Sequence, residues 1–235
     1  MQQYYNQTVT NLLKTMKLIK YLALAFAGFA ALSLSAYDDG DFQTWLSVSA
    51  KTSLGEKSTL SLSQEFRSGD DSSELYDVET FLAVSYKVSD AFKVSYGHLH
   101  VELKSAGDWN SIDTPTLDFI FNQPLGEGWK IEERVRVEYH IVQNGEDYDR
   151  YRFRFKLKSP WKWTSMGINP YVAIEPFYYN KDNNSGWNRV RIYVGATMKI
   201  ADDVSGHVFY LRQRDDKGDW WRDYNILGAS IGFSY

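Results

Sequence analysis

Basic side chains recur at every second position along several segments of this 235-residue chain. The clearest run is in residues 149–158, where Arg150, Arg152, Arg154, Lys156 and Lys158 alternate with apolar or aromatic residues. The same spacing recurs at Arg134 and Arg136, Arg189 and Arg191, and Arg212 and Arg214. Guanidinium groups bind carboxylates and sulfates through paired hydrogen bonds. The spacing therefore predicts a strip of anion-binding side chains on one face of several strands.

Acidic residues share these faces and allow two interpretations. The predicted inward acids are Glu65, Glu79, Asp118, Glu132, Glu138 and Glu175. In the first interpretation, Arg134, Arg136, Arg150, Arg152, Arg154, Arg189, Arg191 and Arg212 line a passage with several weak anion sites, as conduction requires. In the second, the arginines pair with the acids and fill a narrow interior. The sequence leaves both open.

The sequence gives little support for a catalytic site or a metal-binding site. The histidines are His98, His100, His140 and His207, and none has a Ser or acid partner at a diagnostic spacing. Two acidic clusters, at residues 38–41 and 70–74, match no calcium-binding loop. The chain has no Cys, which excludes thiolate ligands and a cysteine nucleophile. We therefore predict no catalytic residue, metal or cofactor.

Strands of alternating polarity must position these side chains. After residue 37 no segment keeps a helical apolar period for three turns, whereas period-two alternation recurs. Eleven segments show it: 43–54, 58–68, 76–88, 92–104, 115–124, 129–142, 149–158, 168–179, 188–200, 204–215 and 223–235. Most are long enough for a tilted membrane strand, which needs about 9–11 residues.

The charged faces indicate which side of these strands points inward. An Arg or Lys that faces lipid at mid-membrane costs about 2–4 kcal/mol, so the arginine ladder must face a lumen. A mean hydropathy of −0.44 excludes a bundle of membrane helices but not a barrel. We predict an all-β, transmembrane, antiparallel up-and-down β-barrel. Single-chain bacterial barrels have even strand numbers, which favours about 12 strands, with 10 as the alternative.

The connections suggest two different rims. Short turns such as Gly126–Gly128 alternate with longer polar stretches such as Ser105–Thr114 and Asn180–Trp187. That layout is typical of periplasmic turns and extracellular loops. Tryptophans stand mostly at segment ends, as in the aromatic girdles at membrane interfaces.

Residues 1–36 read as a targeting segment. Lys17 and Lys20 precede the apolar run 21–34, and small residues precede an acidic stretch, which is typical of a cleaved secretory signal. The alternative natural start is Met16, which places residues 1–15 upstream of it. The alternative to cleavage is a retained membrane anchor. Cleavage after Ala36, with Ser35 as the second choice, leaves one barrel domain, residues 37–235, and changes the net charge from −4 to −7 because three lysines and no acid are lost. Such an acidic chain is not expected to bind nucleic acid.

The last strand carries a further sign of an outer-membrane protein. Leu227, Ala229, Ile231, Phe233 and Tyr235 alternate with small residues, and the chain stops on an aromatic residue. Outer-membrane barrels commonly present such a strand to the barrel assembly machinery. We therefore expect that machinery and outer-membrane lipid as partners.

A series of short motifs resembles the domain-of-unknown-function 2490 family. The motifs run in order from residues 41–45 through 64–67, 134–138, 151–154 and 169–175 to 188–195. The similarity covers about residues 41–235. It implies a small outer-membrane barrel of a Gram-negative bacterium and no established activity, so it carries over no site residue. A looser likeness, in size and arginine ladder only, is to the oligogalacturonate-specific porins.

The sequence thus favours a non-enzymatic, monomeric, porin-like barrel that passes small anionic solutes or anionic oligosaccharides through an Arg-rich lumen. The alternative is a closed structural or interaction barrel with a salt-bridged lumen. The third candidate is a lipid-modifying enzyme with its site at a rim.

Overall fold

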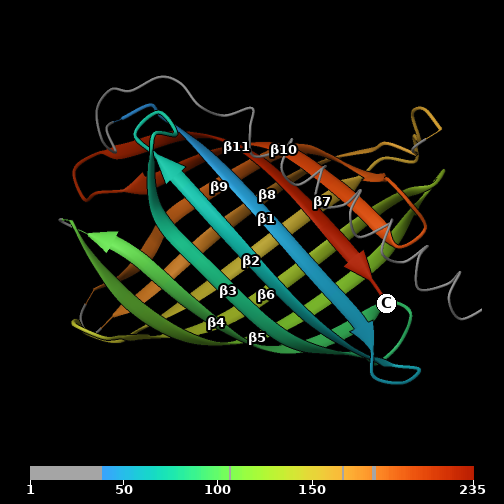
Figure 1. Cartoon of the computed structure of the whole chain (residues 1–235), viewed down its shortest axis with the longest axis horizontal. Coiled ribbons are helices and arrows are strands. Elements are labelled where there is room, and N and C mark those ends of the chain that lie inside the picture. The colour runs from blue at the N-terminus through green and yellow to red at the C-terminus, as the bar shows by residue number, and fades with distance from the viewer. Residues whose placement is uncertain (1–38, 106, 166, 182–183) are drawn as a thin grey trace, which may run out of the picture. The chain divides into compact units, whose positions relative to one another are not determined.

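The computed structural model describes residues 39–105, 107–165, 167–181 and 184–235, which form a closed β-barrel (Figure 1). The segment 1–36, predicted to be a signal, lies outside the described residues. The described strands are β1 (Asp41–Ser53), β2 (Ser58–Gly69), β3 (Glu74–Lys87), β4 (Phe92–Ser105), β5 (Asp108–Gly126), β6 (Trp129–Val142), β7 (Tyr148–Lys158), β8 (Asn169–Lys181), β9 (Asn184–Lys199), β10 (Val204–Asp216) and β11 (Trp221–Ser234). Within the described residues we find no helix long and apolar enough to cross a bilayer.

Each of the eleven predicted segments corresponds to one strand. The prediction of an even number of strands was therefore wrong. Strands joined by hairpins alternate in direction, so an odd number brings the first and last strands together in parallel. β1 pairs with β11 in parallel, from Asp41 opposite Tyr224 to Lys51 opposite Ser234. In Figure 1, β1 (blue) lies between β2 and β11 (red), and the arrows of β1 and β11 point the same way. The other strand pairs are antiparallel.

The predicted contrast between a short-turn rim and a long-loop rim is also wrong. β4 ends at Ser105 and β5 begins at Asp108, while β8 ends at Lys181 and β9 begins at Asn184. The predicted loops at 105–114 and 180–187 are thus largely strand, because their polar residues extend the ladder beyond the apolar part of the wall. The longest connection, residues 159–168, joins strands at the opposite rim. We call the rim where β1 begins the first rim and the rim where β1 ends the second rim.

The wall of the barrel is apolar outside and polar inside. The outer face carries exposed side chains such as Leu62 (50% exposed), Val172 (49%) and Val194 (58%). The inner face buries charged residues, including Glu138 (0%) and Glu175 (1%). The period-two pattern predicted this division for most strands.

An apolar cluster backs the parallel closure of the barrel. Trp45 of β1, Leu211 of β10, and Tyr224 and Ile226 of β11 are buried against one another. On the same side of the barrel the ring of Phe209 covers Gly228, where a Cβ would lie 2.0 Å from Phe209 Cζ. Glycine in a strand often marks such a close approach. The interior is therefore largely apolar near this closure and again on β4, where Leu99 and Val101 are buried, while β2, β3 and β6–β9 carry most of its charges.

Candidate functional site: the charged lumen

Most predicted ladder residues face the interior of the barrel. Arg134 and Arg136 come from β6, and both are buried. Arg150, Arg152 and Arg154 of β7 and Arg189 and Arg191 of β9 line cavities or pair with inward acids. The predicted acids Glu65, Glu79, Glu132, Glu138 and Glu175 also face inward, where each pairs with a basic side chain.

Two fully buried carboxylates organise the arginines of β6 and β7. Glu138 accepts a hydrogen bond from Arg150 Nε and lies 3.0 Å from Arg152 Nη1. Glu175 of β8 accepts a short hydrogen bond from Arg134 and lies 3.0 Å from Arg152 Nη2. Each carboxylate therefore holds at least two guanidinium groups. Charge-assisted hydrogen bonds of this kind are about twice as strong as neutral ones.

Other basic residues of this region pair mainly with other carboxylates, and Arg136 Nη1 also lies 3.8 Å from Glu138. Arg136 donates from Nε and Nη2 to the carboxylate of Asp118, at 2.6 and 2.7 Å. Arg154 and Lys158 share Glu132, at 2.8 and 2.6 Å. We call the inward charges of β6–β9 the basic wall, because its cations outnumber its carboxylates.

Across the lumen, β2 and β3 form the reverse arrangement. Arg67 lies among Glu65, Asp77 and Glu79, with nitrogen–oxygen distances of 2.6, 3.0 and 2.5 Å. We call these four residues the acidic wall. Sequence reasoning missed Arg67 and Asp77, although period two places Arg67 with Glu65 and Asp77 with Glu79.

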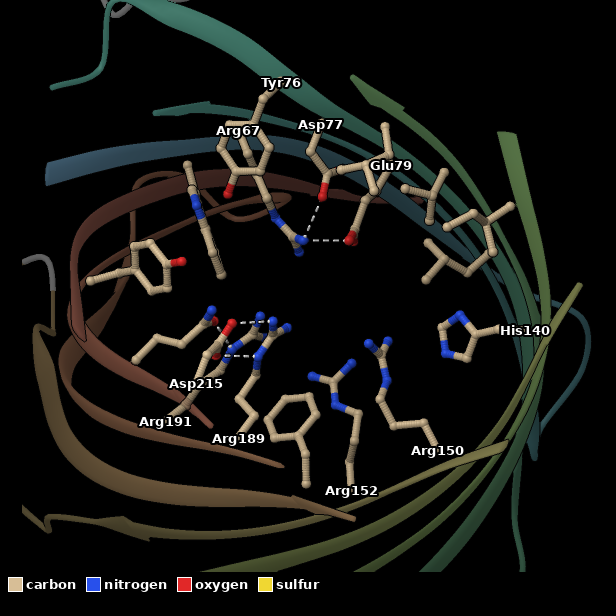
Figure 2. A pocket seen from close by; sticks show the side chains of 18 of the residues that line it. Arg67, Tyr76, Asp77, Glu79, His140, Arg150, Arg152, Arg189, Arg191 and Asp215 are labelled. Atoms are coloured by element: carbon tan, nitrogen blue, oxygen red, sulfur yellow. Dashed lines mark hydrogen bonds and ion pairs between the residues drawn. The ribbon is translucent and has the colours of Figure 1, made fainter. Parts of the chain in front are cut away.

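A β-bulge adds a tyrosine to the acidic wall. The β2–β3 register shifts after Arg67, which pairs with Asp77, so that Ser68 pairs with Leu75 and Tyr76 is left over. The bulge turns Tyr76 into the lumen, where its hydroxyl donates to Gln43 Oε1 at 2.8 Å (Figure 2). Bulges often re-aim a side chain in this way. The sequence gives no signal for this bulge.

Two cavities of similar size lie one behind the other in the described part of the lumen. The first, of about 260 Å³, lies toward the first rim, between the acidic wall and Arg150, Arg152, Arg189 and Arg191 (Figure 2). The second, of about 250 Å³, lies toward the second rim, and its lining includes Arg154, Lys156 and His207. The residues that line both are Trp45, Arg67, Glu79, Arg152 and Arg191. These five side chains form the partition between the two cavities.

Trp45 is the centre of this partition. The guanidinium carbons of Arg67 and Arg191 lie 4.1 and 4.8 Å from the centroid of its ring, so the indole contacts a cation from each wall. The expectation that tryptophans form interface girdles is therefore wrong for Trp45. Period two does place it on the polar face with Ser47, and that signal could have found it. Trp109, Trp161, Trp163, Trp187, Trp220 and Trp221 are exposed.

Arg191 and Lys156 are inward cations that pair with no carboxylate of the described residues. Arg191 donates from Nε to Gln213 Oε1 at 2.7 Å and stacks against Phe177 as well as Trp45. The ammonium of Lys156 lies 3.9 Å from the centroid of the Tyr171 ring. Their positive charge is the part of the ladder that the described acids leave uncompensated.

Arg212 is not in the lumen, and its assignment to the ladder was wrong. Phe209, Leu211, Gln213 and Asp215 take the inward positions of β10, so Arg212 and Arg214 face outward. Both donate to Asp223 on the outer face of β11, at 2.6 and 2.7 Å. They lie near the first rim, beyond the apolar part of the wall. The inward assignment rested on the cost of a charge that faces the lipid core. A charge near the rim does not face that core, so this cost does not apply to Arg212.

The rims also carry ion pairs between strand ends and turns. At the first rim Lys181 lies 2.8 Å from Glu146, and at the second Lys87 lies 2.6 Å from Asp90. The hydrogen bond and charge of the lysine lower the pKa of each of these two carboxyls below its ordinary value. These pairs hold turns rather than a site.

All four histidines have partners that their sequence spacing did not indicate, and His207 Nε2 lies 2.7 Å from the Tyr171 hydroxyl. On the outer face, His98 and His100 lie 2.9 and 3.0 Å from Asp113 Oδ1. Inside, His140 lies between the Thr114 hydroxyl (3.1 Å) and Glu138 (3.2 Å). This hydroxyl–imidazole–carboxylate order resembles a nucleophile, base and orienting acid, but the Thr114 side chain is fully buried and presents no surface to a substrate. No group of three or more His, Asp or Glu among the described residues could hold a metal ion.

The fold and interior define a closed β-barrel with an ion-paired, hollow lumen. A family model described as "Protein of unknown function (DUF2490)" matches residues 42–223, so the chain belongs to that family. The chain is also similar to an uncharacterized protein of Methylorubrum extorquens, with 28% identity over 208 residues, which cover 85% of this chain and 88% of the relative.

Proposed function

We propose that this protein is an exported outer-membrane β-barrel, and that its lumen is a narrow, non-enzymatic passage for small charged solutes. The observation that carries the membrane part is the reversal of polarity across the wall. Exposed apolar side chains cover the outer face, while Glu138, Glu175 and Arg191 are buried inside. In water such an outer face would be a large apolar patch. In a bilayer it is the face that a barrel needs.

The passage part is supported by the two cavities and their lining. Eight strands give a barrel that side chains just fill, while 16 leave an aqueous channel. Eleven strands lie between these cases, and here they enclose cavities of about 260 and 250 Å³. The uncompensated charges of Arg191 and Lys156 would draw anions toward the partition.

Cell fractionation and planar-bilayer recording test the two parts separately. In a Gram-negative host we expect the chain in the outer membrane, shortened after residue 36, and dependent on the C-terminal segment Leu227–Tyr235 for assembly. Refolded protein should give discrete, anion-preferring conductance steps. A membrane-inserted protein without such steps would contradict the passage and leave the membrane assignment intact.

A closed structural or interaction barrel is the second candidate, and the ion pairs favour it. Glu138, Glu175 and Asp118 hold most of the guanidinium groups of β6 and β7 in fixed positions. This candidate predicts a folded, inserted barrel with no conductance. The third candidate, a lipid-modifying enzyme, would require lipid hydrolysis that disappears when His98 or His140 is replaced by alanine.

A further inference from the structure

The acidic wall contains a buried oxygen atom without a donor. Asp77 is 6% exposed, and its Oδ2 accepts from Arg67 at 3.0 Å. Its Oδ1 has no hydrogen-bond partner among the described residues, and Asp77 lines the first cavity. An unsatisfied buried carboxylate oxygen is costly. A donor that enters the cavity would remove that cost.

The opposite side of the same cavity contains the complementary group. Arg191 is 5% exposed, lines the first cavity, and pairs with no carboxylate of the described residues. Its neighbour Arg189 is paired, donating from Nε and Nη2 to the two oxygens of Asp215 at 2.6 Å. In Figure 2 Asp77 and Glu79 lie across the open space of the cavity from Arg191. Arg191 is therefore the cation best placed to receive an anionic group.

The two walls together favour a solute that carries both charges over one that carries a single charge. An anion that pairs with Arg191 also meets Asp77 and Glu79, and a cation that pairs with Asp77 also meets Arg189 and Arg191. Coulomb interactions are stronger inside a small cavity than in water, because the effective dielectric constant there is lower. The positive and negative sides of the cavity therefore both act on a solute that spans it. A solute with an ammonium at one end and a carboxylate at the other gains from both walls.

We propose that the first cavity binds small zwitterions of the amino-acid and dipeptide class. The ammonium lies toward Asp77 Oδ1 and Glu79, and the carboxylate lies toward Arg191. The cavity volume of about 260 Å³ lies just below the range of about 300–1,000 Å³ that is usual for drug-sized ligands. A smaller solute, such as an amino acid or a dipeptide, therefore suits it. This assignment deepens the proposed passage and rests on it, since the cavity must be reachable from a rim.

Four matched solutes test the proposal on the full-length protein in liposomes. Glycylglycine is the zwitterion, N-acetylglycine lacks its ammonium, glycylglycinamide lacks its carboxylate, and N-acetylglycinamide lacks both charges. We expect uptake of radiolabelled glycylglycine to exceed that of each analogue about tenfold, as one lost hydrogen bond to a charged group implies. Equal uptake of the four solutes would overturn the proposal.

Two variants separate charge recognition from a widened lumen. Asp77→Asn should shift the preference from glycylglycine toward N-acetylglycine, and Arg191→Gln should shift it toward glycylglycinamide. The outer-face variant Arg212→Gln is the matched control and should keep the wild-type order. Circular dichroism checks that each variant folds. A rise in the uptake of all four solutes in both variants would indicate only that the lumen has widened, and it would contradict the proposal.

Binding measurements keep this proposal distinct from the passage itself. If no solute enters the vesicles faster than in the absence of protein, the proposed passage is wrong. Equilibrium dialysis of the solubilised barrel with the same four solutes then tests whether the first cavity still binds the zwitterion. Preferential binding of glycylglycine that weakens in both Asp77→Asn and Arg191→Gln supports the site without transport. No preference in dialysis overturns it.

Discussion

The acidic and basic walls of the lumen are built on the same plan with the signs exchanged. On β2 and β3 one guanidinium, Arg67, is shared by three carboxylates. On the basic wall, single carboxylates such as Glu138 and Glu175 are each shared by several guanidinium groups. In both walls the minority charge holds like charges together. Removing a minority charge should therefore damage a wall more than removing one of the majority.

The largest effect is expected from Glu138→Gln. Glu138 is fully buried, and its loss leaves Arg150 and Arg152 without their shared anion. Breaking a buried ion pair by removing one partner costs about 3–5 kcal/mol. Urea unfolding of the barrel in lipid vesicles measures this loss. Arg150→Gln is the matched control, because Arg150 is one of the majority charges held by Glu138, its side chain is 19% exposed, and its loss should cost less. Equal losses in the two variants would contradict the role given to the minority charge.

A smaller loss of stability is expected from Arg67→Gln. The side chain of Arg67 is 13% exposed and that of Glu65 is 26% exposed, so water partly replaces the lost contacts. The loss should be about 2 kcal/mol, as for hydrogen bonds to charged groups. Adding Glu79→Gln should restore part of the stability, because it removes one of the repelling carboxylates. A double variant that is less stable than Arg67→Gln alone would show that repulsion does not govern this wall.

Ion selectivity should change in opposite directions when the two walls are altered. A charge about 8 Å from a passing ion contributes on the order of 0.5 kcal/mol in water, or roughly a twofold change in preference. Arg152→Ala and Arg154→Ala should each lower the anion-to-cation permeability ratio by about that factor, and Glu79→Gln should raise it. The changes should shrink in concentrated salt. Reversal potentials measured in a salt gradient give the ratio, and shifts of the same sign would contradict the two-wall description.

The sequence predicted the strands better than the way in which they close. Alternation located all eleven strands, because one face of each meets apolar surroundings and the other a charged interior. The parallel pairing of β1 with β11 was missed, since it follows from the strand number and not from any local pattern. The extended ends of β5 and β9 were missed because polar residues at a rim look like a loop.

Within the site, the sequence predicted the majority charges and missed much of the acidic wall. Seven of the eight ladder arginines face inward, because lumen-facing charges and period two are local properties. Tyr76 enters the lumen only through a bulge, and the contact of Trp45 with Arg67 and Arg191 joins β1, β2 and β9. Such contacts depend on closure and register. The prediction that Arg212 faces the lumen was wrong for a different reason. Its position along β10, close to the first rim, decides its surroundings.

Arg212→Gln should have the smallest effect and tests that last point. Arg212 lies on the outer face, and its partner Asp223 keeps its hydrogen bond to Arg214 Nε at 2.7 Å. Exposed ion pairs contribute little because water and salt screen them. We therefore expect an unchanged midpoint of urea unfolding and an unchanged permeability ratio, in contrast to Arg152→Ala. A drop in anion preference as large as that of Arg152→Ala would place Arg212 on the path of the ions, and the outward register of β10 would then be wrong.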